Sequence, residues 1–206
     1  YHAGNLLAEK LKEYREKVHV LAIPAGGVPV GAVVSKKLSL PFNLILVRKL
    51  HIPWNPEAGF GAISWDGIVV LNNPLIHLLG LTKEIIDRCV EIERREIRRR
   101  AKRFRQEFFP NIKGEIIILV DDGIASGFTM LVAAKSVKNK NPRKIVVAIP
   151  TGSKKAIDLL MPHVDEIVCL NVRSGPLFAV ADAYRKWSDL SDEDVMRVLR
   201  GFNLSP

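Results

Sequence analysis

The stretch ILVDDGIASGFTM, residues 118–130, joins three chemically different segments within one short run. Apolar residues typical of a buried strand lead directly into two carboxylates, Asp121 and Asp122. A short loop then passes through Ser126 and Gly127 into a segment with helical periodicity. In open α/β sheets, ligands bind beyond the carboxyl ends of the strands, so this junction is the first candidate for a binding site.

The loop that follows the two carboxylates has the features of a phosphate-binding turn. Backbone amides at a helix N-terminus point together at an anion, and Ser126 and Thr129 add hydroxyl donors. A Walker P-loop is excluded because no lysine follows Gly127, and the GxGxxG dinucleotide fingerprint is missing. Asp121 and Asp122 are placed to accept hydrogen bonds from vicinal hydroxyls and to hold a hydrated Mg²⁺. A sugar 5-phosphate satisfies both halves of this motif.

The rest of the chain alternates between buried strands and helices. The predicted strands are the apolar runs at 18–24, 42–50, 67–72, 115–120, 144–150 and 166–172. The predicted helices lie at 28–38, 82–108, 127–139, 153–161 and 192–200, the last with Ser191 as its N-cap. This alternation predicts an α/β fold, a mainly parallel sheet flanked by helices. We expect a single domain over residues 1–206.

Segment 51–67 interrupts the alternation with prolines, glycines and aromatic residues. It is predicted to be a long loop or an irregular hairpin. A lid over a ligand and an ordinary surface excursion are equally good interpretations of it.

The helix predicted at 82–108 is unusually long and basic, with Thr82 as its N-cap. From Arg94 to Arg105 it carries eight basic residues against Glu96 alone. The favoured interpretation is the solvated face of an amphipathic helix, and a nucleic-acid surface is the alternative.

The overall charge is compatible with an anionic partner. A formal net charge of +9 and a pI near 9.7 suit a phosphorylated metabolite as well as RNA or DNA. Cys89 and Cys169 are the only cysteines and form no zinc or disulfide pattern, which favours a cytoplasmic location. No apolar run reaches the roughly 20 residues that a membrane span needs, so we expect no membrane segment.

VDDGIASGFT, residues 120–129, resembles the phosphoribosyl diphosphate (PRPP) binding motif of type I phosphoribosyltransferases. PAGGVPV (24–30) and NPE (55–57) are similar to segments of a group of predicted phosphoribosyltransferases. The resemblance extends over roughly residues 15–175. It implies a type I core with a small hood that holds the acceptor. The candidate hood elements are 1–17 with a helix at 5–17, 51–67, and the tail 173–206 around Phe178, Tyr184 and Trp187.

The resemblance also implies roles for individual residues. Asp121 and Asp122 hold the ribose hydroxyls and Mg²⁺, the metal through water, and they form the catalytic set together with Lys49. The residues that surround the 5-phosphate are Ile124, Ala125, Ser126, Gly127, Phe128 and Thr129. The residues that bind diphosphate are Ala25, Gly26, Gly27, Arg48 and Lys49. A solvated strand end is the alternative interpretation of Arg48 and Lys49.

Two positions depart from the family pattern. Many relatives carry Arg or Lys where this chain has Ala25, so diphosphate binding is expected to depend on Lys49 and backbone amides. Purine transferases that act on hypoxanthine or guanine usually carry an acid at the position of Ala125. The absence of an acid at this position argues against hypoxanthine or guanine as the acceptor.

The function implied by the resemblance is that of a glycosyltransferase of nucleotide metabolism. It transfers the 5-phosphoribosyl group from PRPP to a nitrogen nucleophile, a base or an amine, and releases diphosphate. A homodimer is expected, and nothing in the sequence identifies the acceptor. The alternative is a non-catalytic regulator on the same fold, which senses PRPP or binds nucleic acid through Arg94–Arg105. A phosphatase with Asp121 as nucleophile is disfavoured because the DxDx pattern is missing.

Overall fold

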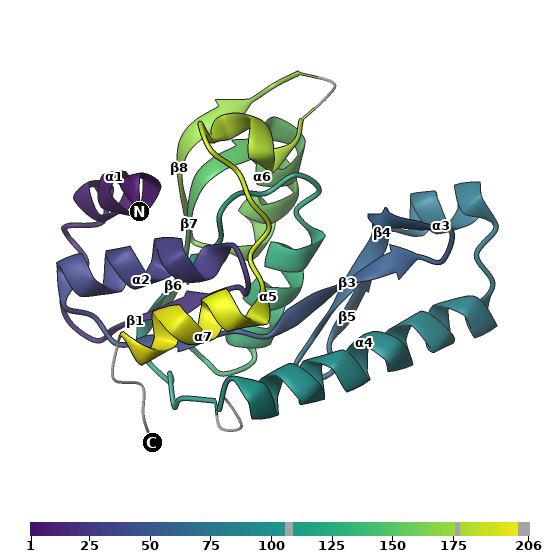
Figure 1. Cartoon of the computed structure of the whole chain (residues 1–206), viewed down its shortest axis with the longest axis horizontal. Coiled ribbons are helices and arrows are strands. Elements are labelled where there is room, and N and C mark those ends of the chain that lie inside the picture. The colour runs from purple at the N-terminus through teal and green to yellow at the C-terminus, as the bar shows by residue number, and fades with distance from the viewer. Residues whose placement is uncertain (106–108, 176–177, 202–206) are drawn as a thin grey trace.

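The computed structural model describes residues 1–105, 109–175 and 178–201. Its centre is a five-stranded sheet in the order β2-β1-β6-β7-β8, and all neighbouring strands are parallel (Figure 1). The strands are β1 (Val18–Ala22), β2 (Phe42–Leu44), β6 (Ile116–Val120), β7 (Lys144–Ser153) and β8 (Glu166–Arg173). The predicted parallel sheet flanked by helices is confirmed.

Both faces of the central sheet are covered, which explains why its strands read as continuous apolar runs. Val20 of β1 and Ile118 of β6 enter one hydrophobic cluster, whereas Leu21 and Leu119 enter a second. The helices of the first cluster include α1 (His2–Lys10), α2 (Gly27–Leu38) and α7 (Asp192–Arg200). The helices of the second cluster are α5 (Phe128–Lys138) and α6 (Lys154–Leu160), and η1 (Met161–His163) follows α6.

A second, antiparallel sheet in the order β3-β4-β5 forms an arm that projects from this body (Figure 1). The elements of the arm are β3 (Val47–Ile52), β4 (Asn55–Ser64), β5 (Val69–Leu71), α3 (Asn73–Leu79) and α4 (Lys83–Arg103). The pairing of β3 with β4 shifts register on both sides of His51. Segment 51–67 is therefore an irregular hairpin, one of the two predicted alternatives.

The run 42–50, predicted as one strand, is two strands in different sheets. The amide of Ile45 still donates to the carbonyl of Ala22 in the central sheet at 2.9 Å, but the carbonyl of Leu46 accepts from Trp65 of the arm, also at 2.9 Å. The chain thus leaves one sheet and enters the other within two residues. The apolar pattern gives no sign of this break because both strands are buried.

The helix ends differ from prediction in several places. The N-terminal helix spans His2–Lys10 instead of 5–17, and α3, opened by the side chain of Asn72, was not predicted. Thr82 caps α4 as predicted, but α4 ends at Arg103, and residues 106–108 of the predicted helix lie outside the described residues. Ser191 caps α7 as predicted, in a reciprocal capping box with Asp194. Among the described residues, no helix combines the length and apolarity needed to cross a membrane.

Candidate functional site

Asp121 and Asp122, the acid pair, follow the last residue of β6 at the carboxyl edge of the central sheet. The amide of Asp122 donates to Oδ1 of Asp121 at 2.9 Å, which holds the first carboxylate against the turn. Burial and the neighbouring charge of Asp122 raise the pKa of Asp121 well above its ordinary value. Burial also raises the pKa of Asp122. The site thus crowds two carboxyl groups whose charged forms are destabilised, and a cation or hydroxyl donors would stabilise those charged forms.

The glycine loop predicted to bind diphosphate packs directly on this acid pair. A Cβ atom built on Gly26 would lie 1.9 Å from Oδ2 of Asp122, and one built on Gly27 would lie 2.6 Å from the carbonyl oxygen of Val120. Only glycine permits such an approach, because any side chain would overlap these atoms. Ala25 precedes this contact, and the Pro24–Ala25 peptide bond is cis. The structure therefore brings together the two motifs that are far apart in the sequence.

The predicted phosphate loop, residues 124–129, continues the parallel pairing beyond the end of β6. The amide of Ile124 donates to Thr151 of β7 at 3.0 Å, and the amide of Ser153 donates back to Ile124 at 2.9 Å. The hydroxyl of Ser153 also donates to the carbonyl of Ala125 at 2.7 Å. These contacts fix the loop on β7 and leave Ala125 and Ser126 exposed.

The loop ends at the N-terminus of α5, which begins at Phe128. Gly127 has φ +84°, a left-handed conformation that favours glycine, and it lets the chain turn into the helix. Among the described residues, no side chain caps this helix end. The first backbone amides of a helix have no intrahelical acceptor. The amides at the start of α5, at Phe128 and Thr129, are therefore available to an anion.

Arg48 and Lys49 lie on β3 of the arm and not at the end of a central strand. Nε of Arg48 donates to Oε2 of Glu93 in α4 at 2.8 Å, and Nζ of Lys49 donates to the carbonyl of Glu57 at 3.2 Å. A small space lined by Pro24 and Arg48 places the base of the arm beside the glycine loop. A single predicted strand over residues 42–50 would place Arg48 and Lys49 at the end of a strand of the central sheet. That placement is wrong, because the chain changes sheets before Arg48.

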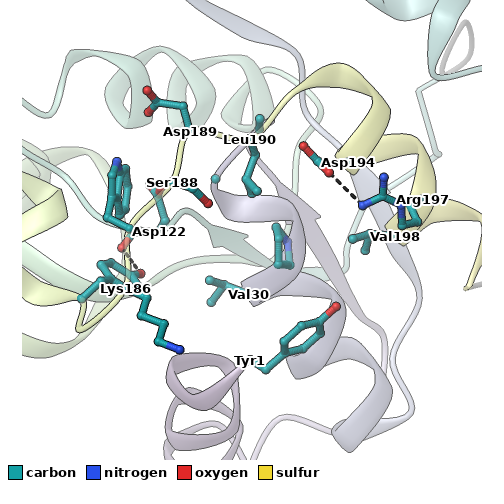
Figure 2. Close-up of a pocket in the computed structure, with 15 residues that line it drawn as sticks. Tyr1, Val30, Asp122, Lys186, Ser188, Asp189, Leu190, Asp194, Arg197 and Val198 are labelled. Carbon is teal, nitrogen blue, oxygen red and sulfur yellow. Dashed lines mark hydrogen bonds and ion pairs between the residues drawn. The ribbon is translucent and has the colours of Figure 1, made fainter.

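A cavity of about 580 Å³ opens over the glycine loop and Asp122 (Figure 2). Ala25, Gly26 and Asp122 line its inner side. Its outer side is formed by the C-terminal part of the chain, including Tyr184 and Trp187, the tail residues expected in a hood. A volume in the range of roughly 300–1,000 Å³ is typical of small-molecule sites.

Sequence reasoning did not find several residues around the cavity. Asp189, Leu190, Arg197 and Val198, from the tail and from α7, also line this space (Figure 2). The capping box at Ser191 predicts the helix but not that it folds back over α2. Aromatic residues in the tail were the only available signal, because nothing in the local pattern records a contact so distant in sequence.

The basic stretch of α4 is largely occupied by ion pairs. Arg94 and Arg95 each lie 3.2 Å from Glu91. Arg99 lies 2.7 Å from Glu96, and it also contacts Asp192 of α7 at 2.8 Å. A face with this pairing presents less free positive charge than the sequence suggests.

Comparison with known proteins is consistent with this geometry. A model of the family described as the phosphoribosyl transferase domain matches residues 1–180. A Mycobacterium tuberculosis protein, provisionally named a phosphoribosyl transferase, is 38% identical over 200 residues, in strain CDC 1551 / Oshkosh and in strain ATCC 25618 / H37Rv. The match covers 96% of this chain and 45% of the relative, so the chain spans about half the length of these curated relatives.

Two solved structures show the same fold. The crystal structure of the TT1426 protein from Thermus thermophilus has a TM-score of 0.76 and 36% identity, and the match covers 96% of this chain and 94% of that one. The AQ2163 protein from Aquifex aeolicus has a TM-score of 0.52 and 13% identity over 82% of this chain and 71% of its own. At that identity the second likeness concerns the fold alone.

Proposed function

The chain belongs to the phosphoribosyl transferase domain family, and on this premise we propose that it transfers the 5-phosphoribosyl group of PRPP to a nitrogen nucleophile with release of diphosphate. One observation carries this proposal, namely the packing of Gly26 and Gly27 on the acid pair. This packing places the glycine loop against the acid pair, and residues 124–129 follow the acid pair directly in the sequence. We assign the glycine loop to one anion, the acid pair to a diol and residues 124–129 to a phosphate. PRPP carries a diphosphate, a ribose diol and a 5-phosphate, which match these three sites in that order.

Each part of the site has a role in this proposal. The carboxylates of Asp121 and Asp122 accept hydrogen bonds from the ribose hydroxyls. The loop 124–129 binds the 5-phosphate through the uncapped amides of α5 and the hydroxyls of Ser126 and Thr129. The glycine loop binds diphosphate through backbone amides.

The residues present also fit a magnesium ion. Among the described residues, no cluster of three or more His, Cys, Asp or Glu side chains is arranged to hold a metal. Mg²⁺ usually needs no such cage, because it keeps several waters and binds one or two carboxylates together with substrate phosphates. Asp121 and Asp122 are the carboxylates that would hold it here, through water. Bound there, it would neutralise charge on the diphosphate.

The reaction breaks the bond between C1 of the ribose and the diphosphate oxygen, and a nitrogen of the acceptor forms the new bond to C1. The electron pair of the broken bond leaves with diphosphate, and the acceptor nitrogen loses a proton. The protein contributes position and charge: the acid pair orients the ribose, and the amide of Gly26 stabilises the leaving group. The amide of Gly27 instead donates to the carbonyl of Ile23 at 3.0 Å and holds the turn in place. Lys49 is proposed to approach the diphosphate from the arm.

Water has to be excluded from C1, or PRPP is hydrolysed. Tyr184, Trp187 and the start of α7 cover the cavity from outside, which supports this role for the C-terminal part of the chain. The planar rings of Tyr184 and Trp187, with centroids 5.3 Å apart, also provide an apolar wall for the acceptor.

Release of diphosphate tests the proposal. The protein is incubated with PRPP, Mg²⁺ and a panel of nucleobases and amines, and diphosphate is measured with and without each acceptor. We expect acceptor-dependent release that is lost in the Asp121→Asn/Asp122→Asn variant. Tight PRPP binding without release, for every acceptor tried, would instead favour the non-catalytic PRPP-sensing regulator.

A further inference from the structure

Residues 184–198, here called the C-terminal strap, connect the interior of the cavity to the surface of α4. Tyr184 and Trp187 line the cavity. The strap passes Lys186, Ser188 and Asp189 and continues into α7 (Figures 1 and 2). It forms most of the outer wall of the cavity. Access to Asp122 from that side therefore depends on where the strap lies.

Tyr184 anchors the inner end of the strap on the acid pair. Its hydroxyl donates to the backbone carbonyl of Asp122 at 2.6 Å, and its ring contacts Trp187. Burial first, and then the charges of Asp122 and Asp121, raise the pKa of Tyr184, so the phenol keeps its proton at neutral pH. The hydrogen bond joins the strap to the turn that orients the carboxylate of Asp122.

Three arginines of α4 anchor the outer end. Asp192, the first residue of α7, is only 8% exposed. Its carboxylate lies 2.8 Å from Arg99, 3.0 Å from Arg100 and 3.7 Å from Arg103. We call Arg99, Arg100 and Arg103 the arginine clasp. Because Asp192 is buried, loss of these partners would leave a desolvated charge without compensation.

The two anchors of the strap are polar, whereas the rest of α7 is held by apolar packing. Val195 and Leu199 are buried in the same cluster as α2, so the helix remains docked by apolar contacts when the ion pairs break. The segment before Asp192 has no comparable apolar anchor, since Lys186, Trp187 and Ser188 are exposed. Opening is therefore confined to the part of the strap that covers the cavity.

We infer that the arginine clasp of α4 holds the C-terminal strap closed over the cavity, and that Tyr184 is a positioning residue that transmits this closure to Asp122. This gives the basic helix a task within its own chain and accounts for the buried Asp192. The closure is inferred from the geometry alone. The inference that it affects PRPP binding at Asp122 rests on the proposed function.

Hydrogen exchange of the whole chain, without ligand, tests the closure. In Asp192→Asn we expect the amides of residues 184–191 to exchange at least ~10-fold faster, while those of β1 and β6 keep their rates. The control is Asp158→Asn, which removes an exposed ion pair with Lys154 on α6 and should leave the strap unchanged. Unchanged exchange in the strap of a folded Asp192→Asn protein would overturn the inference.

If Asp192→Asn does not fold, a milder variant is used for the same exchange measurement. Arg103→Gln removes the longest of the three contacts, together with the ion pair between Arg103 and Glu193, and leaves Arg99 and Arg100 in place. It should speed exchange in the same residues by a smaller factor, with the sheet unaffected. Equal acceleration throughout the chain, or none in the strap, would mean that the clasp supports only global stability.

The role of Tyr184 is tested with Tyr184→Phe, which keeps the ring and removes only the hydroxyl. By calorimetry we expect PRPP affinity to fall ~5-fold or more, as for one lost hydrogen bond beside a charged group. Trp187→Phe, which keeps the hydrogen bond to Asp122, should change PRPP affinity less. Equal affinities of Tyr184→Phe and the parent would remove the positioning role. Failure of the parent to bind PRPP would contradict the proposed function, and the exchange experiment would still decide the closure.

Discussion

Gly26 and Asp122 lie so close together that a single methyl group on the glycine would fall 1.9 Å from a carboxylate oxygen of the aspartate. Gly26 itself has φ −59° and ψ −37°, a conformation that any residue adopts. The need for glycine here is therefore set by the neighbouring side chain and not by the backbone.

This relationship predicts the effect of Gly26→Ala. The methyl group has to displace the carboxylate of Asp122, so PRPP affinity should fall at least ~10-fold, since a charged group moved out of its hydrogen bonds costs about 1.5–3 kcal/mol. Calorimetric titration with PRPP and Mg²⁺ measures the effect. Gly201→Ala is the matched control, because its Cβ would lie 3.3 Å from the nearest atom and its φ is −69°. Parent-like affinity in Gly26→Ala would show that the contact has no part in binding.

The raised pKa of Asp121 predicts that this residue lowers the stability of the folded protein at neutral pH. The pKa of Asp121 is raised in the folded protein, mainly by burial, so folding takes up a proton as the pH falls below the folded-state pKa. The stability contributed by this group is thus present at low pH and is lost as the pH rises from its ordinary value of 3.8 through the folded-state pKa. Removal of the charge should then stabilise the protein at pH 7.

We therefore expect Asp121→Asn to raise the thermal midpoint at pH 7 by about 2–4 °C for each kcal/mol gained. Near pH 4 the parent carboxyl is already protonated, and the two proteins should unfold at similar temperatures. Asn also keeps the oxygen that accepts from the amide of Asp122. A variant that is less stable than the parent at pH 7 would contradict the pKa direction.

The arm supplies a prediction about Lys49. Its ammonium matters most when charge accumulates on the leaving diphosphate, so Lys49→Ala should slow diphosphate release by at least ~10²-fold while PRPP affinity falls less. Lys83→Ala, an exposed lysine at the start of α4, is the control. Equal losses in rate and affinity would assign Lys49 to binding alone, and an intact rate would exclude it from the site.

The ion pairs of the α4 arginines predict weak binding of nucleic acid. Arg99 and Arg103 are engaged with α7, and Arg94 and Arg95 are engaged with Glu91. We expect no submicromolar affinity for RNA or DNA oligonucleotides at roughly physiological salt, and a steep decrease of any weaker binding as salt rises. Submicromolar binding that is lost in an Arg98→Gln/Lys102→Gln variant would contradict this and support the regulator.

The central sheet could be predicted from the sequence because its strands are buried on both faces and read as continuous apolar runs. The position of the acid pair and of residues 124–129, between a strand end and a helix start, could be predicted because a strand, two carboxylates and a helical segment follow one another within a few residues. The break between β2 and β3 could not, since Leu44 and Val47 are equally buried in different sheets.

The tail around Tyr184 and Trp187 was expected in a hood, and both residues line the cavity, but the contacts that hold this part of the chain in place could not be predicted. The contact of Tyr184 with Asp122 joins residues that are 62 positions apart, and the pairing of Arg99 with Asp192 joins residues that are 93 positions apart. Local periodicity records neither contact. The basic helix was interpreted as a solvated face, with a nucleic-acid surface as the alternative, and neither interpretation included the acidic partners that α7 supplies.

The central claim is that the acid pair binds the ribose of PRPP, and calorimetric titration of PRPP with Mg²⁺ into Asp121→Asn/Asp122→Asn tests it most directly. The matched control is Asp87→Asn/Asp158→Asn, which removes the same number of negative charges from exposed positions. We predict that the acid-pair variant stays folded and loses PRPP affinity by at least ~10²-fold, as for the loss of two charge-assisted hydrogen bonds, while the control binds like the parent. Equal PRPP affinity of the folded acid-pair variant and the parent would contradict the account.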